Sequence, residues 1–124
     1  MKTEIKKQNL NDEYYTDEKC YITELSNDKN DEAASIARAR VEPGVTTRWH
    51  CLRDTVERYV ILSGIGLVEA GNLPAKQVTS GDVVLIPPMC RQRIHNVGKE
   101  DLLFLAICTP RFRQDVYEDL ENNP

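Results

Sequence analysis

Two stretches of fixed spacing constrain the fold of this chain more than any other feature. The first places a histidine and a glutamate between two glycines, in the order Gly44-x5-His50-x6-Glu57-x6-Gly64. The second follows after 16 intervening residues and has the order Gly81-x5-Pro87-x4-Gln92-x3-Asn96. Glycine and proline supply the backbone conformations that turns need. The spacing therefore predicts short elements that are joined by turns at defined points.

The segments between these turns are typical of β-strands. Runs rich in β-branched and aromatic residues alternate with turn signals about every eight to twelve residues, which indicates an all-β sandwich or barrel. Residues 33–41 also have helical propensity, but their alternation and the motif that follows them favour a strand. The expected strands cover residues 20–25, 33–41, 46–52, 56–62, 65–69, 76–79, 82–86, 92–97 and 102–108.

The two stretches resemble the two sequence motifs of the cupin superfamily, and the resemblance covers about residues 35–110. It implies an all-β fold, a double-stranded β-helix or jelly-roll barrel. We expect a polar N-terminal arm over residues 1–13, the barrel over residues 14–110 and a C-terminal tail over residues 111–124.

The C-terminal tail carries an apolar pattern of its own. Phe112, Val116 and Leu120 are spaced four residues apart. This spacing places them on one side of a helix. We therefore expect a short C-terminal helix that packs on the outside of the barrel.

The resemblance also implies a candidate metal site. In metal-bearing cupins three histidines and one glutamate bind Mn, Fe, Ni, Zn or a similar ion. By position, this chain offers His50, Glu57 and Gln92 as ligands, whereas Leu52 replaces one histidine outright. A glutamine carbonyl is a weaker ligand for these ions than an imidazole. A single divalent transition-metal ion and a metal-free, hydrogen-bonded pair of His50 and Glu57 are both open interpretations.

Strand alternation predicts which side chains share the interior with this polar centre. Arg48 lies on the same face of its strand as His50, and Tyr59 on the same face as Glu57. We expect Arg48, Tyr59 and Gln92 to bind the ligand, with Arg48 forming a forked pair with a small carboxylate or phosphate. Alternatively, Arg48 pairs with Glu57 or reaches the rim. Glu57 and His50 are the candidate catalytic residues.

Two other reactive side chains fall on the opposite faces of their strands. Alternation turns His95 away from the face of Gln92, and Cys51 away from the face of His50. The four cysteines are far apart, and none forms a C-x-x-C pair. In a cytoplasmic protein they are best interpreted as free thiols.

Composition excludes several classes of function. The chain has 124 residues and a net charge of −4, and its basic residues form no continuous patch, which argues against nucleic-acid binding. No apolar run approaches the roughly 18 residues of a transmembrane helix. The N-terminus lacks the apolar core of a secretory signal, so we expect a cytoplasmic protein without a membrane partner.

Three functions are compatible with these observations. The first is a metal-assisted enzyme, an isomerase, lyase or dioxygenase that acts on a small polar metabolite. The second is a metal-free module that binds a small acid or sugar, favoured by Leu52 and Gln92. The third is a structural or regulatory domain that acts as a homodimer.

Overall fold

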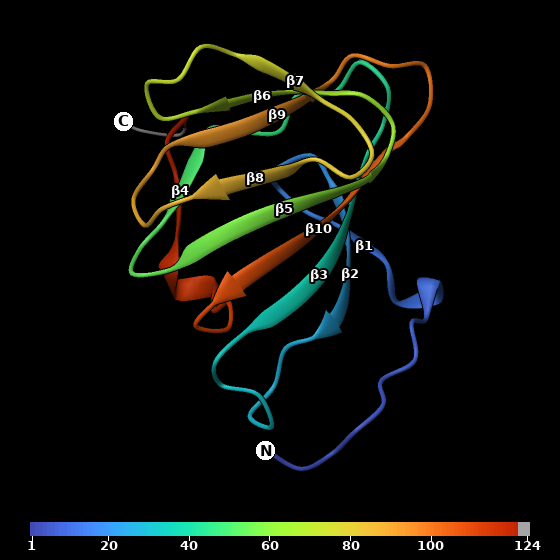
Figure 1. Cartoon of the computed structure of the whole chain (residues 1–124), viewed down its shortest axis with the longest axis vertical. Helices are drawn as coiled ribbons and strands as arrows, with labels where there is room; N and C mark the ends of the chain where they lie inside the picture. The colour runs from blue at the N-terminus through green and yellow to red at the C-terminus, as the bar shows by residue number, and fades with distance from the viewer. Residues whose placement is uncertain (122–124) are drawn as a thin grey trace.

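The computed structural model describes residues 1–121, which form two antiparallel β-sheets with short 3-10 turns (Figure 1). The first sheet has the strand order β1 (Tyr14–Tyr15), β2 (Tyr21–Ser26), β3 (Ser35–Val41), β10 (Leu102–Thr109), β5 (Val56–Ser63) and β8 (Val83–Ile86). The second has the order β11 (Tyr117–Asp119), β4 (His50–Leu52), β9 (Gln92–Asn96), β6 (Gly66–Ala70) and β7 (Lys76–Val78). The all-β barrel expected from the sequence is confirmed.

The pairing register divides the barrel interior into an apolar end and a polar end. At one end Leu102 of β10 lies opposite Val41 of β3, and both are fully buried. At the other end of β10, Cys108 lies opposite Ser35 of β3 and Glu57 of β5. All three of these polar-end residues are also buried. The hydrophobic core therefore fills one end, and the other end is left for a polar site.

Gly64 ends the first sequence motif for a steric reason. Its φ of +91° lies in the region that side chains disfavour, and an added Cβ would lie 2.8 Å from the backbone oxygen of Asp101. The glycine lets β5 turn tightly into β6 beside the loop that precedes β10. Its place in the motif is thus explained by backbone geometry.

The predicted C-terminal helix is wrong. The segment forms a 3-10 turn, η2 (Gln114–Val116), and then the strand β11, which pairs with β4. The backbone N–H of Arg53 donates to the oxygen of Val116 at 2.9 Å, and that of Leu120 donates to Trp49 at 2.9 Å. The free edge of β4 satisfies these backbone groups, whereas a helix this short is only marginally stable. Residues 122–124 of the predicted tail lie outside the described residues.

The strand predicted over residues 46–52 is shorter than expected and begins at His50. The preceding residues bond to two different partners instead of one. The backbone N–H of Thr47 donates to Ile94 of β9 at 2.9 Å, and that of Arg48 donates to Glu18 at 3.2 Å. This divergence brings the loop before β2 close to β4.

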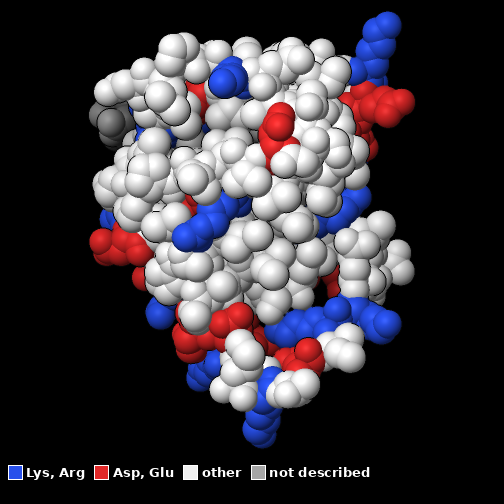
Figure 2. Space-filling model, in the orientation of Figure 1, with Lys and Arg blue, Asp and Glu red and all other residues white. Residues whose placement is uncertain are grey.

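The N-terminal arm lies at one end of the molecule, next to the loop between β2 and β3 (Figure 1). It contains the 3-10 turn η1 (Leu10–Asp12), and Lys6 forms an ion pair of 2.6 Å with Asp28. Charged side chains of both signs gather at this end (Figure 2). Residues 1–121 contain no helix that is long and apolar enough to cross a membrane. The homodimer stays a prediction.

Candidate functional site

The polar end of the barrel contains a cavity of about 530 Å³. Its wall includes side chains from β2, β3, β4, β5 and β10. Two segments far apart in the sequence, residues 14–18 and 112–119, complete it. The volume is within the range of roughly 300–1,000 Å³ that is typical of small-molecule sites.

Glu57 is the most buried carboxylate of this wall, with 9% of the residue exposed. Its Oε2 accepts a long hydrogen bond from the Cys108 thiol at 3.8 Å, whereas Oε1 has no hydrogen-bond partner among residues 1–121. Burial raises the pKa of the Glu57 carboxyl to about 7, because the charged form loses its hydration. The nearby His50 opposes this shift in part. Glu57 is thus able to gain or lose a proton near neutral pH.

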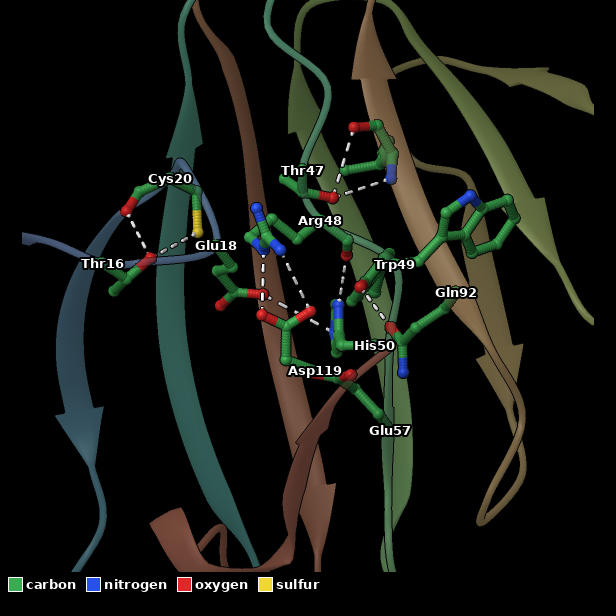
Figure 3. Close-up of polar contacts among 12 residues, drawn as sticks. Thr16, Glu18, Cys20, Thr47, Arg48, Trp49, His50, Glu57, Gln92 and Asp119 are labelled. Carbon is green, nitrogen blue, oxygen red and sulfur yellow. Dashed lines mark hydrogen bonds and ion pairs between the residues drawn. The ribbon is translucent and has the colours of Figure 1, made fainter. Parts of the chain in front are cut away.

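His50 is held in one orientation by polar contacts with Arg48 and Glu18 (Figure 3) and by the ring of Tyr117. Its Nδ1 lies 2.8 Å from the backbone oxygen of Arg48, and because a carbonyl oxygen only accepts, Nδ1 carries the hydrogen. On the other side of the ring, Nε2 lies 3.6 Å from Oε2 of Glu18. The imidazole also stacks on Tyr117, with ring centres 5.0 Å apart and an interplanar angle of 19°.

Glu18 and His50 both line the cavity. The contact of 3.6 Å between Nε2 of His50 and Oε2 of Glu18 is an ion pair when the imidazole is protonated. The two residues thus place an acid–base group beside the cavity, opposite in kind to the buried carboxyl of Glu57.

Tyr59 and Gln92 form a buried hydrogen-bonded pair next to Glu57. The Tyr59 hydroxyl donates to Oε1 of Gln92, and the Tyr59 ring packs on Phe104 with ring centres 4.6 Å apart. Burial raises the pKa of Tyr59 well above its usual value, so its hydroxyl stays a donor. The Gln92 oxygen is thus a neutral amide oxygen that already accepts one hydrogen bond, which makes it a weak metal ligand.

Arg48 is not among the residues that line the cavity, but it forms a forked ion pair with Asp119, which does line it (Figure 3). Its Nε donates to Oδ2 of Asp119 at 3.0 Å, and a terminal nitrogen donates to Oδ1 at 3.4 Å. The pair joins the segment before β4 to β11. His50, Glu57 and Tyr59 line the cavity, whereas Gln92 and Arg48 do not. The guanidinium of Arg48 is directed toward the C-terminal strand. Their roles in ligand binding stay predictions.

His95 and Cys51 both lie outside the cavity wall. The His95 ring is hydrogen-bonded to the hydroxyl of Thr46, and the Cys51 thiol donates to Glu118 at 3.6 Å. All four cysteines are free thiols.

Sequence reasoning missed two residues that line the site beside His50, Glu18 and Tyr117. Glu18 lies in a turn before β2 in which Lys19 has a φ of +71° and the hydroxyl of Thr16 donates to the oxygen of Cys20 at 2.8 Å. A charged residue in such a turn normally indicates solvent exposure. The neighbouring Tyr14 and Tyr15 were the available signal, because paired aromatic residues are unusual in a solvated loop.

The donor set does not fit the metal site that the sequence resemblance implies. No group of three or more His, Cys, Asp or Glu side chains within residues 1–121 is arranged to hold a metal ion. Nε2 of His50 faces Glu18, Gln92 offers only a neutral amide oxygen that accepts from Tyr59, and Leu52 supplies no donor. We therefore derive no chemical step through a metal.

We expect the purified protein to hold metal well below one ion per chain after dialysis against Mn, Fe, Ni and Zn salts. Elemental mass spectrometry of tag-free protein measures this, with His50→Ala as the matched variant. Stoichiometric metal that disappears in His50→Ala would contradict the expectation and restore His50 as a ligand.

Comparisons with known proteins agree on the fold. A family model described as a cupin domain matches residues 37–108. Oxalate decarboxylase OxdC of Bacillus subtilis (strain 168) is 29% identical over 109 residues, a match that covers 85% of this chain. The chain spans only 27% of the length of that relative.

Solved structures of similar size have the same architecture. Pac13, a nucleoside dehydratase of Streptomyces, superposes with a TM-score of 0.76 at 18% identity, covering 95% of this chain and 92% of Pac13. Variants of Pac13 with a histidine or a tyrosine replaced have been solved with uridine. A predicted oxalate decarboxylase from Thermotoga maritima superposes with a TM-score of 0.67 at 27% identity, covering 73% of this chain and 80% of that protein. The double-stranded β-helix expected from the sequence is thereby confirmed.

Proposed function

The chain belongs to the cupin family, and from this premise we propose that it is a metal-independent acid–base enzyme. Its substrate is a small polar metabolite that binds in the barrel cavity, and its reaction is of the lyase or isomerase type. Glu57 and the Glu18–His50 pair are the reacting groups. Tyr59 and Gln92 position Glu57, and Phe104 contributes to the apolar wall.

The observation that carries this proposal is that Glu57 is buried with one carboxyl oxygen that lacks a hydrogen-bond partner among residues 1–121. This oxygen is Oε1, and Glu57 lies on the cavity wall. An unsatisfied buried oxygen is unfavourable by roughly 1–3 kcal/mol, and a ligand that donates a hydrogen bond to it removes this penalty. A general base is most effective when its pKa lies near the working pH, as the pKa of about 7 does for Glu57.

The second reacting group is His50, which lies beside Glu18 on the cavity wall. The Glu57 carboxylate removes a proton from a carbon next to a carbonyl group of the substrate. In a dehydration, the electrons of that C–H bond form a C=C bond while the neighbouring C–O bond breaks. The leaving oxygen takes a proton from the Glu18–His50 pair and departs as water. An isomerisation returns the proton to a different atom of the substrate.

The relatives support this class of reaction. One is an oxalate decarboxylase and another a nucleoside dehydratase. Both names describe the removal of a small group, carbon dioxide in the first and water in the second. The cavity of this chain offers the acid and the base that such an elimination requires.

Comparative metabolite profiling tests the proposal. A cell extract is incubated in D2O with metal-free wild type, with Glu57→Gln and with His50→Gln, and the products are followed by mass spectrometry. We expect compounds that lose water or incorporate deuterium with the wild type and are unchanged with either variant. Conversion rates should fall by about 10²–10⁴-fold, the usual contribution of a general acid or base. Equal conversion by all three proteins, or none by wild type, would overturn the proposal.

A further inference from the structure

The cavity wall is strongly acidic. Five carboxylate residues line it, namely Asp17, Glu18, Glu24, Glu57 and Asp119. Among the described residues that line it there is no lysine or arginine. Arg48, which does not line the cavity, is engaged by the lining residue Asp119 at 3.0 Å. A carboxylate or phosphate ligand would therefore meet charges of its own sign and find no lysine or arginine on the described wall to pair with.

The same wall is also rich in aromatic rings. The chain has eight aromatic residues, and six of them line the cavity: Tyr14, Tyr15, Tyr59, Phe104, Phe112 and Tyr117. They come from the N-terminal loop, β5, β10 and the C-terminal segment. Aromatic faces attract cations through the negative charge above and below the ring.

The unpartnered oxygen of Glu57 adds an independent indication of a ligand. Glu57 is nine-tenths buried at the inner wall, and its Oε1 has no partner among residues 1–121. A positively charged group next to this oxygen compensates for its lost hydration. The ring of Tyr59 and that of Phe104, two residues 3% exposed, form the neighbouring apolar wall.

We propose that the cavity binds a small organic cation, a metabolite whose ammonium group lies between the aromatic rings and the carboxylates of Glu18 and Glu57. This inference rests on the proposed function, because it assigns the class of substrate to the same cavity. A cationic ligand takes the place of the small carboxylate or phosphate expected from the sequence, because that expectation required Arg48 to face the interior.

Three probes of the same shape and different charge test the charge preference. Choline is a cation, 3,3-dimethylbutan-1-ol is its neutral isostere, and 3,3-dimethylbutanoate is an anion. Isothermal titration calorimetry of the full chain measures their affinities, with ethanolamine added as a primary ammonium. We expect the affinity of the tighter-binding cation to be at least about tenfold higher than that of the neutral isostere. The anion should have the lowest affinity.

Matched variants place the binding in this cavity. Glu18→Gln and Glu57→Gln should each lower the affinity for the cation by about tenfold or more, while the affinity for 3,3-dimethylbutan-1-ol stays unchanged. Glu100→Gln, which removes an exposed carboxylate outside the cavity, is the control and should change neither affinity.

The outcomes separate this inference from the proposed function. Equal or tighter binding of the neutral or anionic probe, no binding of either cation at millimolar concentration, or unchanged cation affinity in both variants would overturn the inference. A neutral metabolite that is converted by wild type and not by His50→Gln would also overturn it, while leaving the acid–base function intact. Cation binding without conversion of any metabolite would support the inference and overturn the proposed function.

Discussion

Replacement of Glu57 by glutamine is expected to stabilise the fold by about 3 kcal/mol at pH 8 and to change its stability little below pH 4.5. The raised pKa means that the folded protein keeps the Glu57 proton between pH 4.5 and about 7, whereas the unfolded chain loses it. Stability of the wild type therefore falls as the pH rises through this window and stays lower above it. Glutamine is uncharged at every pH, so the variant lacks this loss.

Urea unfolding of metal-free protein at a series of pH values measures the effect. Glu100→Gln, at an exposed position, is the control and should follow the wild-type profile. A Glu57→Gln variant that is no more stable than wild type at pH 8 would contradict this expectation. It would show that neighbouring groups already compensate the lost hydration of the Glu57 carboxylate. Because the same substitution is expected to abolish conversion of the substrate, stability and activity should change in opposite directions.

Replacement of Asn96 by alanine is expected to destabilise the fold by about 3 kcal/mol. The Asn96 residue is fully buried, and its side chain makes three hydrogen bonds. Its amide nitrogen donates to the backbone oxygens of Val41 and Glu100, each at 2.8 Å, and its oxygen accepts from Gly98 at 2.9 Å. Alanine leaves these backbone groups without their partner in a place that water reaches poorly.

Urea unfolding of wild type and Asn96→Ala at the same pH measures this change in the free energy of unfolding. Asn72→Ala, an exposed substitution in the turn after β6, is the matched control and should change stability by less than about 0.5 kcal/mol. A loss below about 1 kcal/mol in Asn96→Ala would mean that the three hydrogen bonds are replaced by others. Asn96 lies outside the cavity wall, so ligand affinity of the folded variant should equal that of wild type.

Much of the barrel could be predicted because its determinants are local. Period-two alternation placed Glu57 and Tyr59 on one face of β5, and both are buried there. The same reasoning placed His50 and Gln92 inside, and these two residues are direct partners across β4 and β9. The spacing of the motifs also predicted where the chain turns. Gly64 is an example, because its tight turn leaves no room for a side chain.

The remaining features depend on contacts between distant segments. Glu18 reaches His50 only because the loop before β2 bonds to Arg48, and no periodic pattern records that contact. Tyr117 reaches the same ring because the tail pairs with the free edge of β4. The four-residue spacing of the tail is equally compatible with a helix when the edge strand is unknown. Arg48 shows the same limit, because its partner Asp119 lies 71 residues away in the chain.

The dependence of the cavity on both early and late segments has a consequence for biosynthesis. A nascent chain extended as far as Thr109 contains the strands of both sheets apart from β11. It still lacks the part of the wall that Phe112 and Tyr117 provide. The last part of the cavity wall is therefore added only when β11 pairs with β4. A ligand that needs the rings of Phe112 and Tyr117 could bind only after that step.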